Sequence, residues 1–294
     1  MLLKDLNLFI VGAPKSGTTA LYEYLKESPD VFFPDFKEPN YFSNNPEGIK
    51  DEEEYLKIFD GHAGEAIVGE CSTSYLYDGD APKRIKNSCA ENTKIIISLR
   101  NPVNMSFSLW QHNVRNGREK LSYQDAVKSI KERRHDSKYI KQGIHRFEYI
   151  ERARYASQVE QYINEFGESN VKIFIYEELF DNIDSGYVDI CNWLGVTAAN
   201  VEFSKHNEAR VVKNQAIQSL VRPSGFLSSV SKKILTRNMR KKVREKISSL
   251  NSKPGKYEVP DKFKNELVTY FENDVDSLIN LAGVDVKKYW KHFN

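Results

Sequence analysis

The residues best suited to chemistry lie in one short stretch near the start of the chain. Residues 12–19 read Gly-Ala-Pro-Lys-Ser-Gly-Thr-Thr, and they follow an apolar run and precede an amphipathic helical pattern. A strand, a glycine-containing turn and a helix N-terminus together present unpaired backbone N–H groups to an anion. Lys15 and the hydroxyls of Ser16, Thr18 and Thr19 add further donors. The pattern therefore predicts a phosphate-binding loop.

The glycine spacing of this loop invites comparison with the Walker A loop of nucleotide hydrolases. That loop places its lysine directly after the second glycine, whereas here Thr18 follows Gly17 and Lys15 stands in the middle of the turn. A nucleoside-triphosphate kinase or hydrolase also needs an apolar strand that ends in a Mg²⁺-binding Asp, and the apolar run 95–99 ends in Arg100. Three alternatives remain at this point: a kinase or hydrolase, a non-catalytic anion-binding module, and a plain tight turn.

A second group of candidate ligands begins at Arg100. Asn101 and Pro102 follow it directly, and Ser108 comes eight residues after the arginine. A guanidinium binds a phosphate through two parallel hydrogen bonds, and a hydroxyl adds a neutral donor. Alone, this sequence would be an ordinary strand-to-helix turn; its assignment as a second phosphate-binding point follows from the resemblance to a known family given below.

The elements that must position these residues alternate along the chain. Apolar runs at 8–11, 66–69, 95–99 and 171–176 are typical of strands covered on both faces. Helical patterns lie between them, at 19–27, 52–59, 81–91, 104–116, 123–134, 152–166 and 187–194. This alternation predicts an α/β fold with a mostly parallel sheet, whose ligands gather at the carboxyl ends of the strands.

Length and composition favour a single domain over residues 1–294 with a C-terminal helix at about 261–282. A hydrophobic content of 40% in 294 residues builds a sizeable core and excludes a mini-protein. No apolar run approaches the roughly 18 residues that span a bilayer, and no export signal is evident. The cysteines Cys71, Cys89 and Cys191 are odd in number and form no CxxC pair. We expect free thiols, no metal and a cytoplasmic location.

The charge is unevenly distributed. Residues 204–256 hold 14 Lys/Arg against 2 acidic residues, although the net charge of the chain is only +2. Such a basic, partly irregular segment could bind an anionic polymer or make peripheral contact with a membrane surface. The alternative is a solvated basic face. Its near lack of interleaved aromatic residues argues against nucleic acid as the partner.

The two motifs together resemble those of sulfotransferases that use 3′-phosphoadenosine 5′-phosphosulfate (PAPS). Residues 14–19 resemble the 5′-phosphosulfate loop of that family, and Arg100 with Ser108 resembles its 3′-phosphate motif. Further stretches are similar to the bacterial and heparan-sulfate-type carbohydrate branch: 37–42, 69–76 and 176–179. The similarity covers roughly residues 6–200, and it is weaker in the final helix. Two positions depart from it: Met105 stands where many relatives have Arg, and Cys71 stands where heparan-type enzymes often carry a substrate-contacting Lys.

The resemblance implies a P-loop-like three-layer fold and a sulfotransferase that moves a sulfuryl group directly, in line, from PAPS to a hydroxyl or amine. The implied acceptor is a carbohydrate, and the nucleotide product is adenosine 3′,5′-bisphosphate, with no metal involved. Glu38 would be the general base, while Lys15 would sit on the bridging oxygen of the departing nucleotide; the alternative for Glu38 is a loop carboxylate paired with a nearby lysine. Glu70 is a second candidate for the base, and with Lys37 it is the expected acceptor contact.

Three further assignments also follow from the resemblance. His112 lies four residues after Ser108, on the same helix face, and matches a histidine beside the acceptor in the N-sulfotransferase branch; a plain surface or core histidine fits equally. Tyr176 matches an adenine contact, or a buried core tyrosine, and Lys213 lies near a loop that closes over the 3′-phosphate. The predicted cofactor-binding residues are therefore Lys15, Ser16, Gly17, Thr18, Thr19, Arg100, Ser108, Tyr176 and Lys213.

Overall fold

The computed structural model forms two compact units, each built from separate stretches of the chain. It describes residues 1–203, 210–214, 243, 246–247, 249–254, 259 and 261–293. The first unit comprises Met1–Met105, Ile150–Ser204 and Glu266–Asn294, and the second comprises Ser106–Tyr149 and Lys205–Asn265. The single domain expected from the sequence stays a prediction, and most of the basic segment 204–256 lies outside the described residues.

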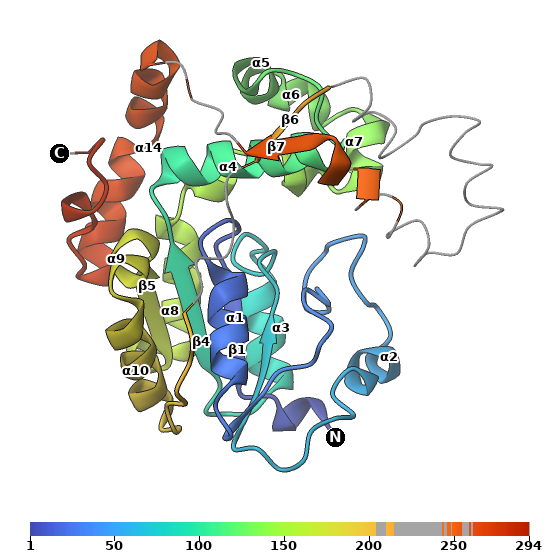
Figure 1. Cartoon of the computed structure of the whole chain (residues 1–294), viewed down its shortest axis with the longest axis vertical. Helices are drawn as coiled ribbons and strands as arrows, with labels where there is room; N and C mark the ends of the chain where they lie inside the picture. Colours follow the sequence, from blue (N-terminus) through green and yellow to red (C-terminus); the bar gives the residue numbers. More distant parts are fainter. Residues whose placement is uncertain are drawn as a thin grey trace. The chain divides into compact units, whose positions relative to one another are not determined.

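Five parallel strands form the sheet of the first unit (Figure 1). Their bounds are β1 Leu8–Gly12, β2 Val31–Phe32, β3 Ile67–Cys71, β4 Lys94–Leu99 and β5 Val171–Ile175. The spatial order is β2-β3-β1-β4-β5. Four strands fall on the apolar runs seen in the sequence, so the predicted parallel sheet is confirmed. Strand β2 was not predicted, because two residues are too few to show a periodic pattern.

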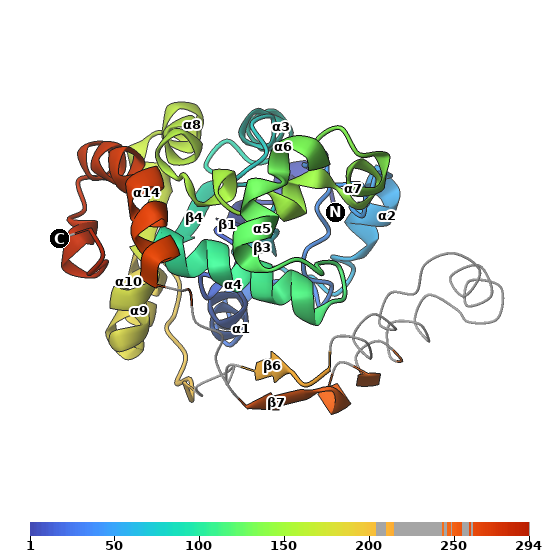
Figure 2. The same cartoon turned by 90° about the horizontal axis from the view of Figure 1, so that it is seen from above.

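Helices cover both faces of this sheet and make three layers (Figure 2). On one face α1 (Thr18–Lys26) contacts α10 (Ile183–Leu194), and on the other α3 (Ala81–Ser88) contacts α8 (Ala156–Phe166). The first unit also contains α2 (Glu52–Lys57), α9 (Tyr176–Asp181) and the 3₁₀ turns η1 (Leu3–Asp5), η3 (Glu151–Ala153), η4 (Glu168–Asn170) and η5 (Val286–Lys288). The layering confirms the predicted P-loop-like α/β architecture.

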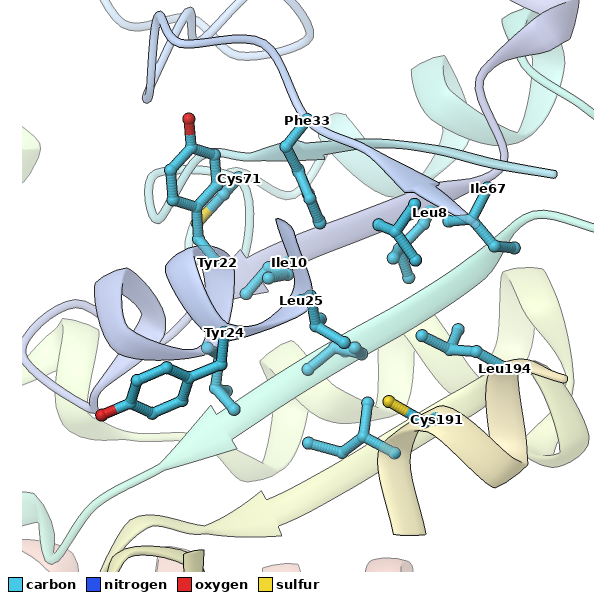
Figure 3. Close-up of a cluster of buried hydrophobic side chains, with 14 of the residues drawn as sticks. Leu8, Ile10, Tyr22, Tyr24, Leu25, Phe33, Ile67, Cys71, Cys191 and Leu194 are labelled. Carbon is cyan, nitrogen blue, oxygen red and sulfur yellow. The ribbon is translucent and has the colours of Figure 1, made fainter. Parts of the chain in front are cut away.

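The core beside α1 fixes where that helix begins. Leu8 and Ile10 of β1 are fully buried, as are Leu25 of α1 and Cys191 of α10, and they meet in the cluster of Figure 3. Alternate residues of a strand face the same side, so both β1 side chains point toward these helices. Because each buried aliphatic side chain stabilises the fold by roughly 1.5–3 kcal/mol, this packing anchors the start of α1 at the carboxyl end of β1.

Two long helices contribute to both units. They are α4 (Pro102–Arg115) and α14 (Asp261–Ala282), and the range of α14 is the one expected from its apolar spacing. The second unit also contains α5 (Tyr123–Lys128), α6 (Ile130–Arg133), α7 (Ser137–Gln142), η2 (Ile144–Phe147) and the antiparallel pair β6 (Arg210–Val212) and β7 (Ser252–Pro254).

Three predicted helices differ most from the structure in where they begin or divide. The range 123–134 divides into α5 and α6 at Ser129, whose hydroxyl donates to the Ala126 carbonyl and competes with regular helix bonding. The predicted start of α8 is instead the separate turn η3, and α10 begins four residues earlier than its apolar pattern.

A buried ion pair holds the second unit together. Arg133 donates through Nη1 to Glu119 Oε2 at 2.6 Å and through Nη2 to Oε1 at 3.0 Å. The Tyr149 hydroxyl donates to Oε2 at 2.9 Å. The Arg133 and Glu119 side chains are only 3% and 1% exposed, so water cannot replace either partner.

We expect Glu119→Gln to lower the free energy of unfolding by about 3–5 kcal/mol, because it leaves the Arg133 charge buried without a counter-charge. Chemical denaturation measures this loss. The matched control is Glu53→Gln, which removes the exposed partner of Lys57 and should leave the unfolding midpoint nearly unchanged. Equal midpoints for the two variants would contradict the role given to the buried pair.

Candidate active site

The predicted phosphate loop joins β1 to α1 and is tied to the neighbouring strand β4. The backbone N–H of Ala13 donates to the Ser98 carbonyl at 2.7 Å. In return, the Ser98 hydroxyl donates to the Ser16 carbonyl at 2.6 Å. Ser98 and Ser16 are both fully buried. These two hydrogen bonds fix the path of the loop across the end of β4.

Two residues of the loop have left-handed backbone conformations. Lys15 has a φ of 62° and Gly17 has a φ of 77°. The latter must be glycine, because a Cβ there would lie 2.2 Å from the Phe180 ring. A non-glycine residue with positive φ is uncommon and costs of order 1–3 kcal/mol, a strain concentrated at functional sites. The loop thus turns at Lys15 directly before the start of α1.

The N-terminus of α1 can accept an anion. Gly17 is the N-cap of this nine-residue helix, and no side chain caps the helix. The first N–H groups of a helix have no partner within it, and the helix dipole favours negative charge there. Thr18 is buried and Thr19 is exposed in this first turn. This geometry is suited to binding a phosphate, and the assignment of these residues to a phosphate stays a prediction.

Arg100 lies directly after β4 and reaches the loop. Its Nη1 donates to the Lys15 carbonyl at 3.2 Å, and its guanidinium lies 4.8 Å from the ring centre of Tyr176, the residue after β5. The Tyr155 hydroxyl donates to the Arg100 carbonyl at 2.9 Å. Arg100 Nε is buried and has no hydrogen-bond partner within the described part of the chain. An anion would satisfy this orphaned donor.

Glu38 lies on the loop after β2, with a φ of 59°. Its backbone N–H donates to the Cys71 carbonyl at 3.0 Å, at the end of β3. Its Oε1 accepts a hydrogen bond from the Thr73 hydroxyl at 2.9 Å and lies 3.5 Å from Lys37 Nζ. The Glu38 side chain is 46% exposed, so a substrate can reach it.

The surroundings of Glu38 keep it ionised. Desolvation raises the pKa of this carboxyl, but the charge of Lys37 and the hydrogen bond from Thr73 outweigh it and lower the pKa below its usual value. Arg152 adds a smaller lowering effect. Glu38 is therefore an accessible carboxylate that can accept a proton at neutral pH.

Glu70, the other candidate base, is enclosed. It lies on β3, has no exposed surface, and accepts hydrogen bonds through Oε2 from the hydroxyls of Tyr55 and Tyr75, both at 2.7 Å. Burial raises its pKa to about 7, although these hydroxyls and that of Ser72 counter the rise. The Tyr75 hydroxyl also accepts from the backbone N–H of Phe42. Glu70 thus helps to hold the loop that carries Glu38.

Three predicted residues belong to the second unit. Ser108 and His112 lie on α4, and His112 Nε2 lies 2.8 Å from the side-chain amide nitrogen of Asn116. Lys213 is exposed and donates through Nζ to the Leu250 carbonyl at 3.0 Å. Their assignment to the nucleotide and the acceptor stays a prediction.

Sequence reasoning missed two residues that support Glu38. Thr73 holds the carboxylate directly, and Arg152 Nη2 donates to the Thr73 carbonyl at 3.0 Å. Thr73 falls within the stretch 69–76 that resembles the family, which could have singled it out. Arg152 carried no signal, because it is 79 residues away from Thr73 in the sequence and lies in an ordinary helical pattern.

The described residues contain neither a metal-binding cluster nor a membrane-spanning helix. Across the described ranges, no group of three or more His, Cys, Asp and Glu side chains is placed to hold a metal ion. Of the helices that the structure describes, none combines the length and apolar character needed to cross a membrane. Cys71, Cys89 and Cys191 are buried free thiols.

Comparison with known proteins identifies the class of this fold and site. The sequence matches the sulfotransferase domain family over residues 5–275, and the chain belongs to this family. The chain is also similar to the crystal structure of a sulfotransferase from Alicyclobacillus acidocaldarius, with 27% identity, a TM-score of 0.72, and coverage of 97% of this chain and 98% of that one. The chain therefore has the fold and the domain of the sulfotransferase family.

Curated relatives include sulfotransferases of carbohydrates. Human carbohydrate sulfotransferase 15 is 26% identical over 146 residues, which cover 35% of this chain and 26% of that protein. Human heparan sulfate glucosamine 3-O-sulfotransferase 6 is 35% identical over 100 residues, which cover 34% of this chain and 28% of that protein. The match thus spans little more than a quarter of the length of each relative.

Proposed function

We propose that this sulfotransferase moves a sulfuryl group from PAPS to a hydroxyl or amine of a carbohydrate. The observation that carries the proposal is the meeting of three strand ends in the first unit. The phosphate loop follows β1, Arg100 follows β4 and Tyr176 follows β5, and Arg100 contacts both of the others. Parallel sheets of this kind bind ligands at the carboxyl edge.

The residues present fit a nucleotide with phosphate on both sides of its ribose. The uncapped N-terminus of α1, with Lys15, Ser16, Thr18 and Thr19, would hold the 5′-phosphosulfate. Arg100 would hold the 3′-phosphate with its orphaned Nε donor. The Tyr176 ring, already against the guanidinium, offers an aromatic contact to the adenine. When bound, PAPS supplies an activated sulfuryl group.

Two side chains then carry the chemistry in this proposal. Glu38, ionised and about half exposed, accepts the proton of the attacking acceptor hydroxyl or amine. Lys15 would set its ammonium against the negative charge that grows on the leaving nucleotide. The hydrogen bond from the Thr73 hydroxyl to Glu38 Oε1 restricts the carboxylate to one orientation. His112 remains a proposed second acid/base or orienting group.

The proposed acceptor is a glycan or glycoconjugate, supported by the names of the curated relatives. Cys71 bears on the type of glycan. It stands where heparan-type enzymes often carry a substrate-contacting Lys, and it is 2% exposed, so it offers no cation to a sulfated chain. A weakly charged sugar acceptor is therefore favoured over heparan. The buried free thiols support the further proposal of a reducing, cytoplasmic location.

Calorimetric titration without metal tests the nucleotide part of the proposal. Adenosine 3′,5′-bisphosphate should bind at least about tenfold more tightly than 5′-AMP, because only the former offers a 3′-phosphate to Arg100. ATP should also bind weakly, although its charge is close to that of the bisphosphate, because ATP has no 3′-phosphate. Equal affinities for the three nucleotides would overturn the proposal and return the kinase-like alternative.

The acceptor is then sought with labelled PAPS and a panel of neutral, carboxylated and sulfated oligosaccharides. Label should enter a neutral or weakly charged member of the panel. Incorporation only into a lipid or a phenol would refute the carbohydrate proposal and leave the nucleotide proposal standing.

A further inference from the structure

The C-terminal segment makes two separate connections to Arg100 and its neighbour. The segment consists of α14 (Asp261–Ala282), η5 (Val286–Lys288) and the residues up to 293. One connection begins at Trp290 and the other at Asp274. All of the residues that make these connections lie in the first unit.

The first connection runs through Glu177. Trp290 is fully buried, and its Nε1 donates to Glu177 Oε2 at 3.0 Å. The other oxygen, Oε1, accepts from the backbone N–H of Asn101 at 3.1 Å. Burial raises the pKa of Glu177, and both hydrogen bonds counter this rise. One carboxylate therefore joins the C-terminal indole to the backbone that directly follows Arg100.

The second connection runs through Tyr155. The Asp274 carboxylate on α14 accepts from the backbone N–H groups of Tyr155 and Ala156, at 2.6 and 3.2 Å, and so caps the start of α8. Tyr155 is fully buried, and its hydroxyl donates to the Arg100 carbonyl. The backbone of Arg100 is thus held from both sides.

Fixing this backbone matters because the guanidinium has to meet an anion in one orientation. Arg100 has four rotatable side-chain bonds, and ordering such a side chain costs about 1–2 kcal/mol. A backbone that is already anchored leaves less to be ordered when the ligand arrives, which is preorganisation. The contacts of Nη1 with Lys15 and of the guanidinium with Tyr176 complete the restraint.

We propose that the C-terminal segment positions Arg100 and thereby determines the preference for nucleotides that carry a 3′-phosphate. This inference rests on the proposed function, since it assumes that Arg100 binds that phosphate. The residues of the two connections act through Arg100 and do not touch the nucleotide; they are Trp290, Glu177, Asp274 and Tyr155. Removing either connection should weaken 3′-phosphate recognition and leave the 5′-phosphate loop unaffected.

Two conservative variants test the two connections separately. Trp290→Phe keeps an aromatic ring but removes the Nε1 donor, and Tyr155→Phe removes only the hydroxyl. Each should raise the Kd for adenosine 3′,5′-bisphosphate roughly three- to tenfold, while the Kd for 5′-AMP stays within about twofold of wild type. Calorimetry on the whole chain measures both constants, and thermal unfolding reports whether each variant is folded.

Tyr289→Phe is the matched control. Tyr289 neighbours Trp290 and donates to Glu178, next to Glu177, but this exposed hydrogen bond does not lead to Arg100. The control should bind both nucleotides as wild type does.

Three results would overturn the inference. Equal weakening of both nucleotides would mean a merely structural role, and unchanged binding in both test variants would mean that Arg100 needs no such support. If wild type itself fails to prefer the 3′-phosphate, the proposed function fails first, and the inference falls with it. If Trp290→Phe does not fold, a folded Tyr155→Phe protein tests the hydrogen bond to the Arg100 carbonyl, and Asp274→Ala tests whether that bond depends on the C-terminal segment.

Discussion

Lys15→Ala should reduce the rate of sulfuryl transfer by about 10²–10³-fold, the loss typical of removing one donor to a developing negative charge. Lys15 stands at the turn of the phosphate loop, which Ser98 and Arg100 hold in place from β4. Among the positively charged side chains, that of Lys15 is the nearest in sequence to the start of α1, where the leaving phosphate would bind. Release of adenosine 3′,5′-bisphosphate from PAPS, in the presence of the best glycan acceptor, measures the rate.

A backbone effect has to be separated from the loss of the ammonium. Lys15 has a φ of 62°, a conformation that alanine adopts with strain and glycine adopts freely. Lys15→Gly should therefore lose as much activity as Lys15→Ala, while Lys57→Ala, on the exposed surface of α2, should lose none. Recovery of activity in the glycine variant would mean that loop strain, and not the charge, explains the loss.

Local sequence was sufficient to predict where the loop at 12–19 and Arg100 lie relative to the sheet. The loop at 12–19 and Arg100 each directly follow an apolar run, and a run of that kind has few alternatives to a buried strand. Once the strands are parallel, their carboxyl ends must lie at one edge. The contact between Arg100 and the Lys15 carbonyl is therefore a consequence of topology that the sequence pattern already contained.

The support of each site residue could not be predicted in the same way. Tyr155 reaches Arg100 across 55 positions, and Arg152 reaches Thr73 across 79, so neither contact produces a spacing that can be recognised. Which of the two glutamates is buried could not be predicted either, because tertiary packing decides it. The sequence shows Glu38 and Glu70 each in an aromatic-rich stretch, but only the packing of Tyr55 and Tyr75 encloses one of them.

Glu38→Gln should reduce the rate of sulfuryl transfer by about 10²–10⁴-fold, the usual contribution of a general base, while nucleotide binding is retained. The amide keeps the size of the side chain but cannot accept the proton. Glu70→Gln is the matched comparison, because it makes the same change one strand away in a side chain with no exposed surface. It should reduce the rate much less, since Glu70 acts by holding the loop. A larger loss in Glu70→Gln than in Glu38→Gln would transfer the base role to Glu70.

The pH dependence of kcat/KM distinguishes the same two carboxyls without a change to either of them. The pKa of Glu38 is lowered, so its basic form is complete above the ordinary glutamate range and is lost only as the pH falls below that range. The pKa of Glu70 is about 7, so a rate that depended on its carboxylate would decline as the pH falls through 7. We therefore expect kcat/KM to show no carboxyl-dependent decline between about pH 8 and pH 5. A protonation limb near pH 7 that persists in His112→Gln would favour Glu70, whereas one that disappears in that variant would identify His112.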